Sequence, residues 1–275
     1  MKKLSIFLAI LLVLSLVLCG CSIKFFYPNE QAYSIGNFTY DSSKIKEVDI
    51  DWIAGEIDVI ISSENGQLSV SESGTDLTEN QKMRYLISNG KLTVKFWKSR
   101  YDGKVKDGDK NLTVYLPKDV DLKINGVSCK ISINDGSLDE LEVSSVSGAI
   151  VMGNVEIKND LSLSAVSGSI LAEEIKAHSL EVSCTSGNVN VKKLNVEDEI
   201  EFSAMSGNVD IGLVKARELE ISTMSGDVII RNIGNYNIPT QNIKADIFTD
   251  GYTQGDQNLL VEITTMSGDV YLRNS

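Results

Sequence analysis

The sequence predicts an all-β protein that folds as a right-handed parallel β-helix, or β-solenoid, with coils of 19–20 residues behind an irregular N-terminal β cap. A ten-residue unit recurs five times between residues 141 and 233, and its apolar and polar residues alternate as in a strand with one buried face. So short a period has no room for a crossover helix of about a dozen residues. The Ser-Gly pairs that mark the repeat contain Gly148, Gly168, Gly187, Gly207 and Gly226, at steps of 20, 19, 20 and 19 residues, and Gly268 belongs to a further copy.

Each position of the repeat predicts a place in the coil, when the unit is numbered from its first apolar residue. Positions 1 and 3 are apolar and positions 2 and 4 are mostly polar, while apolar pairs at 10 and 12 and at 15 and 17 indicate two more short strands. Position 6 is mostly apolar, so we expect the inward-facing phase to slip by one residue there, at a bend or bulge. Glycine at position 8 suits a corner that needs a positive φ or a close backbone approach. The alternative is an antiparallel sandwich or barrel of hairpins, whose strands rarely keep the same apolar phase at so strict a period.

The first 20 residues have the pattern of a secretory signal, with two lysines followed by a short apolar run. The sequence Leu18-Cys19-Gly20-Cys21 resembles the lipobox of bacterial lipoproteins, and the resemblance implies that Cys21 carries the lipid as the new amino terminus. Ordinary signal cleavage or an uncleaved anchor are the alternatives. We expect residues 21–45 to form a lipidated tether that attaches the protein to a membrane.

Residues 46–275 are predicted to form one β-solenoid domain. A copy of the unit begins at Val48, and a worn copy begins at Leu122 with Cys129 in place of glycine, 19 residues before Gly148. We therefore expect an irregular cap over 46–121 and regular coils over 122–233. Residues 234–259 break the register as a degraded coil or an excursion, and 260–275 are the last coil. The excursion is expected to cover the exposed strand edge of the last coil, unless that end pairs with a partner.

Three copies of the turn, Ser206-Gly-Asn-Val, Ser225-Gly-Asp-Val and Ser267-Gly-Asp-Val, carry a resemblance to a known family. The region from about residue 46 to 275 resembles the bacterial adhesin-like family of β-strand repeats, a domain of unknown function that is common in secreted and lipidated proteins. The resemblance implies the solenoid architecture and brings no catalytic residues with it.

Composition limits the classes of partner and cofactor. A net charge of −12 and a pI near 4.7 argue against nucleic acid and against direct adsorption on an anionic membrane. Cys129 and Cys184 lie three coils apart, about 14 Å at the usual strand spacing, which is too far for a disulfide, so we expect both to be free and buried. The sequence has no P-loop or dinucleotide-binding glycine pattern, so no cofactor is predicted. With His178 as the only histidine, a hydrolase triad is not expected either.

Two groups of charged and polar residues are candidate binding sites. Asn and Asp side chains at positions 9 and 11 could hold a cation or a glycan, or could be solvated turn residues, and no metal is predicted with confidence. A basic patch follows a predicted hairpin and could bind an anionic polymer or lipid headgroups, or could be only a charged hairpin and its loop. The first group is Asn188, Asn190, Asn208, Asp210, Asp227 and Asp269, and the second is Lys95, Lys98, Arg100, Lys104 and Lys106.

These observations favour a lipid-anchored, extracytoplasmic scaffold that binds a protein or glycan of the cell envelope and catalyses no reaction. One alternative is an accessory or sensory lipoprotein in envelope stress that acts through a membrane partner. The other is a carbohydrate-active β-helix enzyme, which would bring two or three outer-face carboxylates together in a groove with an Arg or Lys. The ligand, the oligomeric state and the type of envelope are not encoded in any motif of the sequence.

Overall fold

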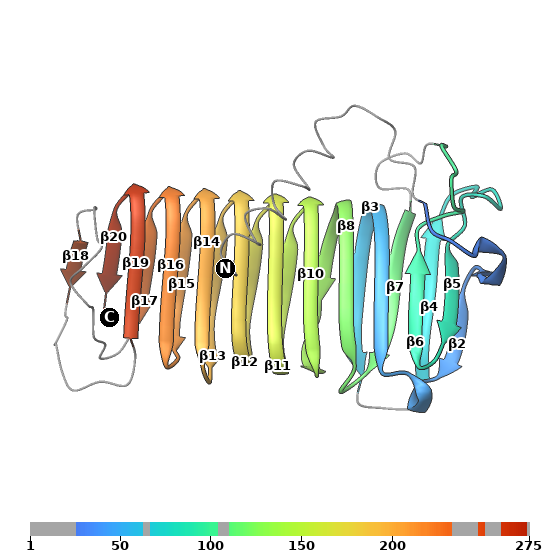
Figure 1. Ribbon diagram of the computed structural model, residues 1–275, viewed down its shortest axis with the longest axis horizontal. Coiled ribbons are helices and arrows are strands. Elements are labelled where there is room, and N and C mark those ends of the chain that lie inside the picture. The colour runs from blue at the N-terminus through green and yellow to red at the C-terminus, as the bar shows by residue number, and fades with distance from the viewer. Residues whose placement is uncertain (1–25, 63–66, 104–109, 233–246, 251–259, 274–275) are drawn as a thin grey trace.

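The computed structural model describes residues 26–62, 67–103, 110–232, 247–250 and 260–273, and these form a long β-solenoid (Figure 1). Its strands lie side by side along the long axis, and one continuous apolar core runs through the stack. None of the helices in these residues is long and apolar enough to cross a membrane. The N-terminal elements are β1 (Ser34–Ile35), β2 (Phe38–Asp41), β3 (Glu47–Ser62), β4 (Gln67–Gly74), β5 (Arg84–Ser88), β6 (Lys91–Lys95), β7 (Lys110–Pro117), β8 (Asp121–Ile133) and β9 (Gly136–Leu138), with short 3-10 turns at Glu30–Ala32 and Ser42–Lys44. The others are β10 (Glu140–Ser147), β11 (Ile150–Ser167), β12 (Ile170–Ser186), β13 (Val189–Val196), β14 (Glu199–Ser206), β15 (Val209–Lys215), β16 (Glu218–Ser225), β17 (Val228–Asn232), β18 (Ile247–Asp250), β19 (Leu260–Ser267) and β20 (Val270–Arg273).

The register confirms that equal positions of the repeat lie next to one another. The leading residues pair in parallel from coil to coil, in the order Leu141, Leu161, Leu180, Ile200, Leu219 and Val261. Positions 10–12 and 14–17 form two further parallel ladders. We call the first ladder the front sheet; it consists of residues 47–52, 121–126, 140–147, 160–167, 179–186, 199–206, 218–225 and 260–267.

The expected slip of phase at position 6 is wrong. Positions 1, 3 and 5 all face inward, and position 5 is buried in most coils, as at Ser145 and Cys184. Position 6 faces outward, and Met224 there is 47% exposed. The alternation therefore continues through position 6, and the chain changes direction at the Ser-Gly corner, where positions 7 to 9 link the front sheet to the next strand segment.

The corner glycines form a column in which each glycine lies on the backbone of the one before it. A Cβ atom on Gly207 would lie 2.7 Å from the carbonyl carbon of Gly187, and φ at Gly207 is +131°. Both reasons expected for glycine therefore apply here, because a side chain would strain the backbone and separate two coils. Cys129 occupies the same column below Gly148, as its place in the sequence predicts.

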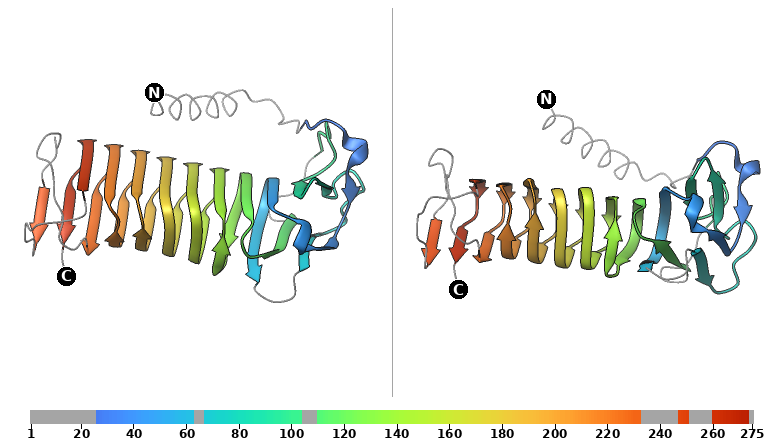
Figure 2. Two further views of the ribbon diagram at one scale, coloured as in Figure 1. Left: turned by 60° about the horizontal axis from the view of Figure 1, so that its bottom comes forward. Right: turned by 90° about the horizontal axis from the view of Figure 1, so that it is seen from below.

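The cap encloses the N-terminal end of the stack by an unexpected chain path (Figure 2). β3 forms a full coil that pairs on one side with β6 and β7 and on the other with β8, so the chain moves outward and then returns past its own first coil. The outer coil of β6 and β7 is covered by antiparallel pairing with β5 and β4, which pair in turn with β1 and β2. Antiparallel strands thus protect this edge of the solenoid.

The C-terminal end partly matches the expected excursion. β18, which lies within the predicted excursion of 234–259, pairs in parallel with β20 of the last coil. This segment therefore adds a strand to the exposed edge, as expected for residues 247–250. The rest of the predicted excursion lies outside the described residues.

Candidate functional site

The column at position 9 has a structural task in every described coil where it carries Asn or Asp. The side-chain oxygen of Asn188 accepts the backbone N–H of Asn208 at 3.0 Å, Asn208 accepts from Asp227 at 2.9 Å, and Asp227 accepts from Asp269 at 3.0 Å. The side chains of Asn188, Asn208 and Asp227 thus each satisfy a corner N–H of the next coil. The predicted cation or glycan role of these residues stays a prediction.

Position 11 lies on a neighbouring face, and in the last coil the Tyr271 hydroxyl at position 11 donates to the Asp269 carboxylate at position 9, at 3.1 Å. The Asp210 carboxylate binds the Arg231 guanidinium through two contacts, at 3.1 Å from Nε and 2.6 Å from Nη2. Asn190 is exposed on the same column. Among the described residues, no group of three or more His, Cys, Asp or Glu side chains is arranged to hold a metal ion.

Two of the three described residues of the predicted basic patch lie beside acidic side chains. Lys95 forms an ion pair with Asp51, and Lys98 lies 3.7 Å from a carboxylate oxygen of Glu30. Arg100 packs over the ring of Phe26, 4.8 Å from its centroid. Because these cations already have partners, they offer less to an anionic polymer than the sequence suggests. Lys104 and Lys106 lie outside the described residues.

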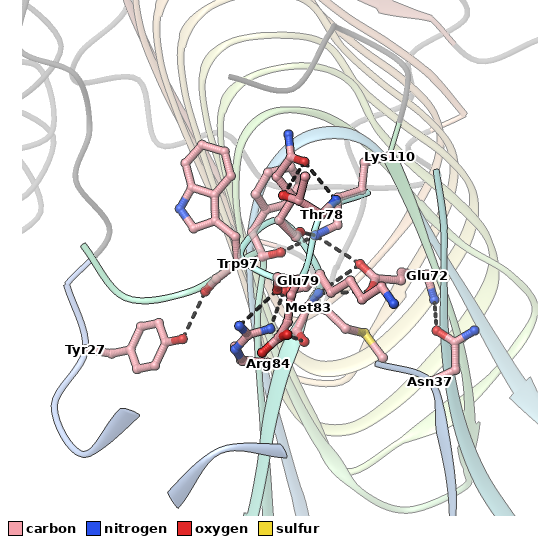
Figure 3. A network of polar contacts seen from close by, with 12 residues as sticks. Tyr27, Asn37, Glu72, Thr78, Glu79, Met83, Arg84, Trp97 and Lys110 are labelled. Atoms are coloured by element: carbon pink, nitrogen blue, oxygen red, sulfur yellow. Dashed lines mark hydrogen bonds and ion pairs between the residues drawn. The ribbon is translucent and has the colours of Figure 1, made fainter. Parts of the chain in front are cut away.

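One lysine next to this patch is buried, and no pattern in the sequence predicts its burial. The Lys110 side chain is fully buried in the cap, where its ammonium lies 3.0 Å from Glu72 and donates to the carbonyl oxygens of Gln81 and Phe96 (Figure 3). Burial lowers the pKa of Lys110 to about 8, although Glu72 opposes the shift. The network holds the outer coil of the cap against its covering strands and has no opening to solvent at the lysine.

The outer surface of the front sheet is the strongest candidate site. Positions 2, 4 and 6 alternate with the inward positions and are at least partly exposed except at Ser183, so side chains of one kind form columns along the axis. Near the cap this surface contains a hollow of about 480 Å³. Burial raises the pKa of the Asp121 carboxyl there, with smaller effects from Asp139 and Glu47. The polar residues that line the hollow are Glu47, Asp121, Lys123, Glu140, Glu142, Asp160 and Ser162.

The hollow contains carboxylates and a lysine, the residue types that the enzyme alternative requires. None of the residues that line it is among the candidate site residues predicted from the sequence. Several carboxylates meet there with one lysine, but Lys123 donates to both oxygens of Glu142, at 2.7 and 2.8 Å. Acidic residues on both sides of a leading apolar residue, as in Glu140-Leu141-Glu142, are the sequence pattern that marks this place. The lysine is thus held in an ion pair on the surface.

The cysteines and the single histidine named in the sequence analysis remain to be placed. Cys129 and Cys184 are free and buried, as their separation predicts, and burial raises the pKa of the Cys129 thiol to about 12. His178 lies on β12 with an exposed side chain, 3.2 Å from Glu197. Cys21, the predicted lipidation site, lies outside the described residues.

Residues 45–273 match the family model described as Toastrack DUF4097. The chain belongs to the Toastrack family. Among solved structures it is similar to a "putative adhesin" from Bacteroides fragilis NCTC 9343, with 12% sequence identity and a TM-score of 0.52 over 88% of this chain and 97% of that chain. It is also similar to a "putative adhesin" from Parabacteroides merdae ATCC 43184, with 18% identity and a TM-score of 0.47 over 86% of this chain and 95% of that chain. No curated protein matches the chain.

The family assignment confirms the resemblance seen in the turn motifs and agrees with the solenoid. At 12% identity the likeness to the Bacteroides fragilis structure concerns the fold alone. The Toastrack domain of this chain therefore has to be interpreted from its own surface, where the front sheet is long, regular and rich in carboxylates.

Proposed function

We propose that this Toastrack protein is a lipid-anchored, extracytoplasmic scaffold that binds a protein or glycan of the cell envelope along its side and catalyses no reaction. The observation that carries the proposal is the front sheet, whose outward columns repeat over successive coils. Such a surface suits an extended or elongated partner, because equivalent contacts recur at about 4.8 Å. The adhesin-like names of two similar solved structures are consistent with a place at the cell surface.

The anchor in this proposal is the lipid on Cys21, since the strongly acidic chain would be repelled by an anionic membrane. A thioether-linked diacylglycerol and the tether up to residue 45 would hold the solenoid outside the membrane. Partners beyond the membrane are an envelope protein or glycan, with no nucleic acid and no small-molecule cofactor.

Membrane fractionation and affinity purification test the proposal together. Cys21→Ala should release the chain from membranes and abolish recovery of its envelope partner by mass spectrometry. Cys19→Ala is the matched control, because it removes the neighbouring thiol and leaves the lipidated residue in place. A Cys21→Ala chain that stays on the membrane, or that recovers the same partner, would contradict the proposal.

A second candidate, a carbohydrate-active enzyme, draws on the acidic hollow near the cap. It predicts release of reducing ends from envelope polysaccharide, lost when Asp121 and Glu140 are changed to Asn and Gln. The accessory or sensory alternative predicts recovery of one membrane protein in stoichiometric amount, from stressed cells only.

A further inference from the structure

Three outward columns run along the C-terminal half of the front sheet, and we call the surface that they form the trough. Position 2 is glutamate on four successive coils, position 4 is serine or threonine, and position 6 is threonine and then methionine. The glutamates are Glu181, Glu201, Glu220 and Glu262; the floor is Ser183, Ser203, Ser222 and Thr264; the third column is Thr185, Met205, Met224 and Met266.

The charge of the trough is one-sided. Residues 179–186, 199–206, 218–225 and 260–267 contain six glutamates and no lysine, arginine or histidine. A partner that binds there gains most from positive charge on the side that faces the glutamate column.

The third column gives the trough an apolar side. Met205 is 38% exposed, Met224 47% and Met266 72%, so these flexible side chains lie on the surface. Val146 and Val166 continue the column toward the cap, half-buried. Methionine adapts its shape to the side chains that pack against it and recurs on binding surfaces.

The dimensions fit an α-helix that lies along the solenoid axis. Positions 2 and 6 are about 13 Å apart along a strand, enough for a helix of about 10–12 Å with its side chains, and the small residues at position 4 permit close approach. Basic side chains on one flank of a helix recur at each turn, about 5.4 Å apart, whereas the glutamates of successive coils are about 4.8 Å apart. After three such steps a basic side chain is displaced from its glutamate by only about 1.8 Å. Alternate residues of an extended strand are about 6.8 Å apart, so after three steps they would be displaced from the glutamates by about 6 Å, which is more than the spacing of one coil.

We propose that this trough binds an amphipathic α-helix of a partner protein, with lysine or arginine along one flank and leucine-like side chains along the other. The inference rests on the proposed scaffold function and names its surface and its partner. The four coils match about ten helical residues at about 1.5 Å each. A second copy is a poor occupant, because the described part of the chain contains no α-helix and carries the same acidic columns.

The test uses the full-length lipidated chain in nanodiscs of zwitterionic lipid. The probe is a fluorescent 14-residue amidated peptide, designed as a helix with lysine along one flank and leucine along the other; the same residues in scrambled order are the control peptide. We expect Glu181, Glu201 and Glu220 changed together to Gln to weaken probe binding at least ten-fold and to reduce its salt dependence. Changing Met205, Met224 and Met266 together to Ser should also weaken binding at least ten-fold, with the salt dependence retained.

The matched control changes three acidic residues on other faces, Glu156, Glu173 and Glu197, to Gln, which alters the net charge by the same amount. It should leave probe affinity within two-fold of the wild type. In spectra of methyl-labelled methionine, the probe should shift the signals of the exposed column and leave those of the buried Met83 and Met152 unchanged.

The inference is overturned if the probe does not bind, if the scrambled peptide binds equally well, or if both trough variants bind like the control. Empty nanodiscs identify binding to lipid, which would also count against it. An envelope partner that is recovered equally by the trough variants would refute the trough and leave the scaffold function standing. Probe binding by a chain that recovers no envelope partner and needs no Cys21 for its location would refute the scaffold function instead.

Discussion

Gly207→Ala tests the central feature of the solenoid, the contact of each corner glycine with the coil before it. The new Cβ would lie 2.7 Å from the carbonyl carbon of Gly187, and the residue would keep a φ near +131°. Neither problem can be relieved by moving a flexible side chain, because the atoms in contact belong to the backbone. We therefore expect the two coils to separate at this corner.

The magnitude follows from what the separation breaks. A non-glycine residue in this backbone region costs about 1–3 kcal/mol. Three hydrogen bonds cross the corner, from Gly187 to Ser206 at 3.2 Å, from Val189 to Asn208 at 2.9 Å and from the Asn208 N–H to the Asn188 side chain at 3.0 Å. At about 0.5–1.5 kcal/mol each they add about 1.5–4.5 kcal/mol, so the total loss in unfolding free energy is about 2.5–7.5 kcal/mol.

Thermal unfolding and hydrogen exchange measure the effect. For a domain of this size 1 kcal/mol corresponds to about 2–4 °C in Tm, so Gly207→Ala should lower Tm by at least about 5 °C. Because contacts in a solenoid connect only neighbouring coils, amide protection should fall most in β12–β15.

Two control variants separate the causes. Ser206→Ala, at the exposed neighbouring residue, should change stability by no more than about 0.5 kcal/mol. Gly36→Ala has a φ of +83° but nothing within 4 Å of the new Cβ, so it measures backbone strain without the clash. A Gly207→Ala protein that melts within 2 °C of the wild type, or one that loses no more than Gly36→Ala does, would refute the reasoning.

Three more predictions concern other parts of the structure. Lys110→Met should destabilise the cap by about 3–5 kcal/mol in urea unfolding followed by tryptophan fluorescence, because it leaves the Glu72 carboxylate buried without its cation; adding Glu72→Gln should recover part of the loss, and no recovery would contradict the pairing. Cys129 and Cys184 should react with iodoacetamide only after unfolding. Burial raises the pKa of the Cys129 thiol to about 12, so above about pH 8.5 the thiol loses its proton in the unfolded state but keeps it in the folded state. The free energy of unfolding should therefore fall as the pH rises above about 8.5, and this part of the fall should be absent in Cys129→Ala. Asn208→Ala should lower the free energy of unfolding, followed by thermal melting, by about 1 kcal/mol. Asn208→Asp should lower it much less, because aspartate still accepts the N–H of the next coil. Equal losses in the two variants would contradict the proposed role of the side-chain oxygen.

The repeat made most of the architecture predictable before any coordinates. A strict period of 19–20 residues with alternating apolar positions leaves few ways to bury the apolar side other than stacked coils. The glycine column followed from the same period, and Cys129 could be placed in it by counting 19 residues back from Gly148. The free, buried thiols follow from the spacing of the coils.

The candidate surfaces were less predictable, because they depend on which residues meet across the stack. Position 6 was expected inside, since apolar residues usually mark the buried phase, yet Met224 lies on the surface because the chain turns only after it. The charge of Lys110 by itself indicates an exposed side chain, but its ammonium lies over the rings of Trp52 and Phe96, which makes it a core residue.

The sequence by itself determined the solenoid, its period, its corner glycines and its family, because these depend on local alternation repeated at a fixed spacing. Only the tertiary structure decided that β3 lies between two coils formed later in the chain, that the Asn and Asp of position 9 bond to the next coil, and that the methionines of position 6 lie on the surface. The physical reason is that these features arise from contacts between segments about 20 or more residues apart, whose partners no local pattern identifies.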